Sequence, residues 1–197
     1  MKKYKAIAIT IVALAALPPL FAQKKESASQ GQKLVAALVD LKRAPADLAV
    51  QKRYLESFPR RYVDFVHLFE PCGQLYDGWE YISILSSLAA QHERSVGQLL
   101  VELSKDAHYE ADAPGYLQQA MATYASLHTK VFVELVKQLA IEKRVHLIVF
   151  LADVENYSSY PAYQDTIDHL RKLGENCLAQ EFEAAREQRL HVRHDQP

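Results

Sequence analysis

Apolar residues recur along most of the chain at spacings of three and four, the periodicity of one face of an α-helix. The first clear stripe is formed by Leu34, Val35, Leu38 and Leu41. Later stripes predict helices over about 48–57, 59–70, 79–91, 93–105, 113–127, 131–139 and 164–189. Whether 113–127 and 131–139 are one bent helix or two stays open, and an interruption of the last helix is expected near Gly174.

The most apolar internal segment is Val145–Ala152, with the sequence VHLIVFLA. Eight such residues fit a buried strand or a buried helix, and periodicity alone does not decide between them. The residues before the segment contain no turn signal. We therefore predict a central buried helix here.

The composition agrees with the stripes, because good helix formers dominate and only six glycines are present. We predict an all-α protein, folded as a single-domain antiparallel helical bundle or a short stack of helical hairpins, with seven to nine helices. The helical domain is expected over 32–189, between a flexible polar tail (23–31) and a frayed C-terminal tail (190–197).

Residues 1–22 have the three-part layout of a secretory signal peptide. A basic head precedes the uncharged run Ala6–Leu17, two prolines end that run, and cleavage is expected after Ala22. The run is shorter than the roughly 20 residues that span a bilayer, which makes a retained membrane anchor the weaker interpretation. The sequence thus predicts an exported protein, periplasmic or secreted, with no membrane attachment after cleavage.

The charge balance bears on the expected partners, and the cysteine content bears on a possible disulfide. Without residues 1–22 the chain has 20 basic against 24 acidic side chains, so no nucleic-acid partner is expected. Cys72 and Cys177 are the only cysteines. In an exported protein they are candidates for one disulfide, and the alternative is two separate buried thiols.

Three stretches are similar to a family pattern: YLESFPRRYVDFVHLF at Tyr54–Phe69, LYDGWEYI at Leu75–Ile82 and DAPGYLQQAM at Asp112–Met121. They resemble a family of small exported all-helical bacterial proteins to which no function is assigned. The resemblance implies a helical fold and export, and it supplies no catalytic residue.

Eight histidines invite a search for metal or acid–base chemistry, and His67, His92, His108 and His146 are the residues that a hydrolase would use. Carboxylates stand at helical spacing from some of them, but such pairs are more often solvated ion pairs than metal ligands. We expect no metal and no cofactor. The link from His108 to Asp112 would suit half of an acid–base site, whereas its plainer role is a polar turn in which Asp112 caps the next helix.

Aromatic side chains gather in two links between predicted helices. Tyr and Trp are common at recognition surfaces because they offer large contact areas with few rotatable bonds. The alternative is that these rings close the ends of the core. The binding candidates are Tyr76, Trp79 and Tyr81 in the first link and Tyr157, Tyr160 and Tyr163 in the second.

The sequence contains no recognisable catalytic constellation: it lacks a nucleophile elbow, a Gly-rich phosphate loop and any Cys-x-x-Cys motif. We therefore expect an exported helical module that binds another protein, with an inhibitory or self-protective role as its most specific form. The alternatives are a carrier of a small apolar ligand, with its cavity under Val145–Ala152, and a metal-dependent or acid–base hydrolase.

Overall fold

The computed structural model describes residues 20–70, 73, 75, 78–108, 112–154 and 160–194, with side chains between residues 30 and 191. Within these ranges the protein is all-helical and contains no strand, which confirms the predicted fold class. Ten helices are present in the described residues, one more than the upper limit of the prediction.

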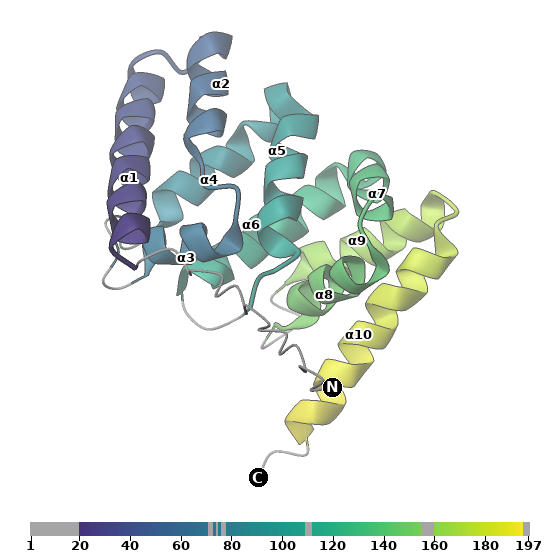
Figure 1. Cartoon of the computed structure of the whole chain (residues 1–197). Helices are drawn as coiled ribbons and strands as arrows, with labels where there is room; N and C mark the ends of the chain where they lie inside the picture. Colours follow the sequence, from purple (N-terminus) through teal and green to yellow (C-terminus); the bar gives the residue numbers. More distant parts are fainter. Residues whose placement is uncertain are drawn as a thin grey trace, which may run out of the picture.

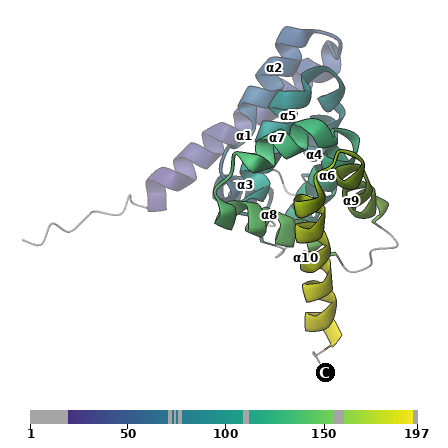
Figure 2. The same ribbon diagram turned by 90° about the vertical axis from the view of Figure 1, so that its right-hand side faces the viewer.

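The helices are α1 (Leu20–Arg43), α2 (Leu48–Ser57), α3 (Tyr62–Phe69), α4 (Trp79–Ser87), α5 (Ala89–Ser104), α6 (Asp112–Leu127), α7 (Thr129–Lys137), α8 (Ile141–Ala152), α9 (Pro161–Lys172) and α10 (Asn176–His194). Helix α6 is central and packs against α3, α4, α5, α7, α8 and α9. The α1–α2 pair lies at one edge, and α8, α9 and α10 lie together at the other (Figure 1). Figure 2 shows the start of α1 and the end of α10 extending away from the other helices, so the arrangement matches a compact bundle only roughly.

Most residues of the apolar stripes predicted from the sequence form one continuous core, but Val35 of the first stripe is 39% exposed. On α6, Leu117, Met121 and Ala125 recur at a spacing of four residues and are completely buried. The segment Val145–Ala152 lies in α8 and is helical, as predicted. Its Leu147, Ile148 and Leu151 are all buried in the core.

The extra helix results from a break at Gly174. This residue has a φ of +78°, a left-handed conformation that glycine adopts without steric cost. The Gly174 amide donates to the Arg171 carbonyl at 3.0 Å and the Glu175 amide to the Leu170 carbonyl at 2.9 Å. This pair of hydrogen bonds is a Schellman motif. It ends α9, so 164–189 forms parts of two helices, as the expected interruption near Gly174 implied.

Several helix boundaries differ from the sequence expectations. Residues 23–31, expected as a flexible polar tail, lie within α1, and α10 continues through the first residues of the expected frayed tail to His194. Helix α3 begins at Tyr62 and not at Pro59, because Arg61 is still extended (φ −112°, ψ 142°). No helix in the described residues combines the length and apolar character needed to cross a membrane.

Candidate functional site

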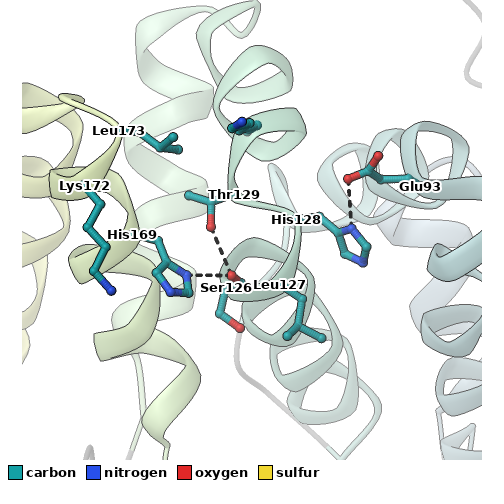
Figure 3. A pocket seen from close by; sticks show the side chains of 9 residues that line it. Glu93, Ser126, Leu127, His128, Thr129, His169, Lys172 and Leu173 are labelled. Atoms are coloured by element: carbon teal, nitrogen blue, oxygen red, sulfur yellow. Dashed lines mark hydrogen bonds and ion pairs between the residues drawn. The ribbon is translucent and has the colours of Figure 1, made fainter.

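An open cleft of about 310 Å³ lies where three parts of the chain meet: the start of α5, the junction of α6 and α7, and the end of α9 (Figure 3). Its lining is polar and charged, with two apolar side chains among the polar ones. The lining residues are Glu93, Ser126, Leu127, His128, Thr129, Lys130, His169, Lys172 and Leu173.

The cleft depends on a break between α6 and α7. At His128 the backbone leaves the helical region (φ −122°, ψ 40°), and this settles the open question in favour of two helices. The Thr129 hydroxyl donates to the carbonyls of Ala125 (2.9 Å) and Ser126 (3.0 Å), groups that the end of α6 leaves without amide partners. No side chain caps the N-terminus of α7. The start of α7 therefore carries a partial positive charge, and its first residues, Thr129 and Lys130, line the cleft.

One wall is built from His128 and Glu93. Nδ1 of His128 lies 2.9 Å from the Glu93 carboxylate and donates to it, which fixes the orientation of the imidazole. The ring also stacks on Tyr124, with centroids 4.9 Å apart and an interplanar angle of 25°. Nε2 of a neutral His128 is then left as an acceptor.

The contact between α5 and α6 below this wall is exceptionally close. The Tyr124 hydroxyl donates to the Glu93 carbonyl at 2.9 Å, and burial raises the pKa of this phenol well above its usual value, so it stays a donor. A Cβ on Gly97 would lie 2.1 Å from the Tyr124 hydroxyl oxygen. Only glycine fits there without displacing Tyr124, and Tyr124 in turn supports both Glu93 and His128.

The opposite wall is formed by α9. Nδ1 of His169 donates to the Ser126 carbonyl at 2.9 Å, so this nitrogen carries the proton. Lys172 lies three residues further along the same helix face, and Figure 3 shows its side chain extending beside His169. This hydrogen bond ties α9 to the end of α6 and holds the two walls of the cleft together.

Two lysines and two leucines complete the lining. Lys130 and Lys172 are exposed, and neither has an ion-pair partner among the described residues. Leu127 is 73% exposed and Leu173 39% exposed, large fractions for leucine. The cleft thus offers positive charge next to apolar surface, which suits a ligand that carries an acidic group beside an apolar one.

The aromatic residues predicted to bind a partner have different environments. Trp79 is 46% exposed at the start of α4 and packs edge-on against Tyr116, with ring centroids 5.3 Å apart. Tyr81 is half-buried against Phe69, and Tyr160 is half-buried where α9 begins. These three residues do not line the cleft.

Tyr163 is a correction to the sequence interpretation. It is only 2% exposed, and its hydroxyl donates to the Phe182 carbonyl at 2.7 Å. Its ring packs on the Phe182 ring at 5.3 Å, so Tyr163 joins α9 to α10 and offers a partner no surface. The reason is that α9 already begins at Pro161, which places Tyr163 on the buried face with Ile167 and Leu170.

Three predicted site residues lie outside the described residues: Tyr76, Tyr157 and Cys72. Cys177 is exposed at the start of α10. The pairing of Cys72 with Cys177 therefore stays a prediction.

The four histidines proposed for a hydrolase are not gathered into one site. His67 is exposed beside Glu70 on α3, and His92 lies at a kink in α5, where Nε2 is 2.8 Å from the side-chain oxygen of Gln51. His108 and His146 do meet, with ring centroids 5.1 Å apart. In the described part of the chain, no three His, Cys, Asp or Glu side chains come together in a way that could hold a metal ion.

The sequence does not predict the cleft, because its lining residues belong to three predicted helices and to the stretch 128–130 that follows one of them. Leu127 was placed on the apolar stripe of 113–127, yet it is exposed because α6 ends there. The available signal was the polar stretch His128-Thr129-Lys130 between two apolar stripes. That His169 and Glu93 reach this stretch could not be inferred, because both lie more than thirty residues from it.

Comparison of the chain with protein-family models, with curated proteins and with solved structures finds no match.

Proposed function

We propose that this protein is a binding module that holds an acidic group of another protein in the cleft between α5, the α6–α7 junction and α9. The observation that carries the proposal is the convergence there of Lys130 and Lys172, which lack ion-pair partners among the described residues, with the exposed Leu127 and Leu173. Export, on the basic head and apolar run of residues 1–22, is part of the proposal. An inhibitory or self-protective role would be one use of such a module.

Positive charge in the cleft favours an anionic group. Two lysine ammonium groups and the uncapped N-terminus of α7 contribute it. Glu93 is the one acidic side chain in the lining, and its carboxylate is engaged by His128. The acidic group of a ligand therefore belongs near Lys130 and Lys172, away from Glu93.

The two leucines favour a peptide over a bare inorganic anion. Burying an exposed leucine side chain contributes about 1.5–3 kcal/mol. An apolar residue next to an acidic one would cover Leu127 or Leu173 while its neighbour meets a lysine. Nδ1 of His169 carries the proton, so Nε2 of the neutral ring is an acceptor for a peptide amide.

The proposal is tested with a fluorescein-labelled peptide, Gly-Gly-Leu-Glu with a free carboxyl terminus, whose binding is followed by fluorescence anisotropy. The matched probe carries the same label on the amidated peptide Gly-Gly-Leu-Gln, which has nearly the same shape and lacks the two carboxylates of the acidic peptide. We expect the acidic peptide to bind more tightly than the neutral one. Binding should weaken as salt is raised, because exposed charges are screened.

Variants locate the binding in the cleft. An exposed ion pair is worth about 0.2–1 kcal/mol, so removing both with Lys130→Gln and Lys172→Gln should weaken the acidic peptide about fivefold. The matched control is Lys33→Gln, an exposed lysine on α1 far from the cleft, which should leave the affinity unchanged. Equal binding of both peptides, or an equal loss in the control, would contradict the proposal.

The apolar-carrier alternative is supported less well. Neither this cleft nor the apolar groove beside α1, lined by Gly31, Gln32, Val35, Ala36 and Leu75, is bordered by residues of Val145–Ala152. The side chains of Leu147 to Ala152 in that segment contribute to the packed core, whereas Val145 is 48% exposed. The hydrolase alternative keeps one favourable observation, the contact between His108 and His146.

A further inference from the structure

Two histidines from distant parts of the chain meet on the side of the molecule where α8 packs against the end of α5. His108 lies in the segment that follows α5 and is exposed, whereas His146 lies on α8 and is half-buried. Their rings are nearly perpendicular (87°), with centroids 5.1 Å apart. Nδ1 of His146 is buried and has no hydrogen-bond partner among the described residues.

The segment 105–108 is attached on both sides. On one side the Tyr62 hydroxyl of α3 donates to the His108 carbonyl at 2.6 Å, and the Tyr62 ring meets the His108 ring edge-on. On the other side Asp106 forms an ion pair with Lys143 of α8. The histidine contact and this ion pair both link the segment to α8.

We propose that His108 and His146 form an acid-sensitive latch between the segment after α5 and α8, which opens when both imidazoles are protonated. With both rings neutral, an edge-to-face contact at this distance is favourable. With both charged, two positive groups face each other at 5.1 Å, and Nδ1–H of His146 becomes a buried donor without an acceptor.

The surrounding charges do not relieve this repulsion. Burial lowers the pKa of His146 below its ordinary value, and His108 and Lys143 lower it further. The Asp106 carboxylate and a hydrogen bond with the Lys105 backbone raise the pKa of His146 by smaller amounts than burial lowers it. Asp106 is already paired with Lys143, and no other described carboxylate acts on His146.

The lowered pKa of His146 determines in which direction the stability of the folded protein changes with pH. The unfolded chain, with an ordinary histidine pKa near 6.5, binds a proton at His146 more readily than the folded protein. Stability from this contact is therefore complete above pH 6.5 and is lost as pH falls toward the lower folded pKa. In that interval the ratio of folded to unfolded protein falls by up to tenfold per pH unit.

The test compares urea unfolding of the wild type and His146→Gln between pH 5 and pH 8. Gln does not titrate, so unfolding of the variant should take up fewer protons below pH 6.5 than unfolding of the wild type does. The exposed His191→Gln on α10 is the matched control and should keep the wild-type slope. If His146→Gln does not fold, the test uses His108→Gln, because His108 is exposed. Its removal should also make the free energy of unfolding depend less steeply on pH.

Hydrogen exchange distinguishes a latch from a general acid effect. The amides of Lys105 and Ala107 donate to the carbonyls of Val101 and Ser104. After correction for intrinsic rates, their opening should increase on going from pH 7.5 to pH 5.5 about tenfold more than that of the buried Phe132 on α7. Equal increases at all three amides, or slopes in both histidine variants equal to the wild-type slope, would overturn the proposal.

Discussion

Gly97→Ala is the substitution for which the structure makes the sharpest stability prediction. An added Cβ would lie 2.1 Å from the hydroxyl oxygen of Tyr124 and 2.4 Å from Cζ of its ring. Both helices are anchored in the core at this level, with Val96 on α5 and Ala125 on α6 completely buried. The ring must therefore shift, and its hydrogen bond to the Glu93 carbonyl must break or lengthen.

Three effects determine how much Gly97→Ala changes the free energy of unfolding. Overpacking a core contact costs about 1–3 kcal/mol, and the lost hydrogen bond adds about 1 kcal/mol. Replacing glycine by alanine inside a helix returns about 1 kcal/mol. We expect a net loss of about 1–3 kcal/mol in the free energy of unfolding from urea denaturation. For a chain of this size the corresponding fall in Tm is about 2–12 °C.

The adjacent exposed Gln98→Ala is the matched control and should change stability by less than about 0.5 kcal/mol. Tyr124→Phe removes the oxygen nearest to the new Cβ, so the double variant should be about 1 kcal/mol more stable than the two single losses imply. A Gly97→Ala protein as stable as the wild type, or more stable through its better helix propensity, would refute the reasoning.

Three further single substitutions have expected effects on stability or binding. Tyr163→Phe removes the buried hydrogen bond from the Tyr163 hydroxyl to the Phe182 carbonyl and should cost about 1 kcal/mol in urea unfolding. Gly174→Ala meets no atom within 4 Å but must adopt a φ of +78°, so a loss of about 1 kcal/mol is expected from conformational strain alone. Glu93→Gln removes the only acidic group in the cleft lining and should tighten binding of the Gly-Gly-Leu-Glu peptide about two- to threefold, and unchanged affinity would show that the peptide binds elsewhere.

The spacing of apolar residues along the chain predicts most of the helices of this fold. The stripes predict the helices because each must bury one face, and Val145–Ala152 is helical for the same reason. The break at Gly174 was also available from the sequence, because glycine is the residue that tolerates a positive φ. The burial of Tyr163 was available too, since it stands at helical spacing from Ile167 and Leu170 and follows a proline suited to the first turn.

The sites could not be obtained in this way, because they depend on contacts between distant segments. Glu93 meets His128 across 35 positions, and His169 meets Ser126 across 43. His108 was identified as half of a possible titratable site, but nothing local indicates that His146 is its neighbour. Periodicity shows which face of a helix is buried and not which helix covers it.

The central claim is that the cleft holds an acidic group beside an apolar one, and an NMR titration tests it most directly. The ligand is N-acetyl-leucine, which has one carboxylate and one apolar side chain, and the control ligand is its neutral amide. The account predicts saturable shifts from the acid that centre on the amides of Thr129, Lys130 and Lys172 and on the ring of His169, with little response to the neutral ligand. Figure 3 shows Thr129, His169 and Lys172 in the lining of the cleft. Equal shifts from both ligands, or acid-induced shifts centred on Trp79 or on the α1 groove, would contradict it.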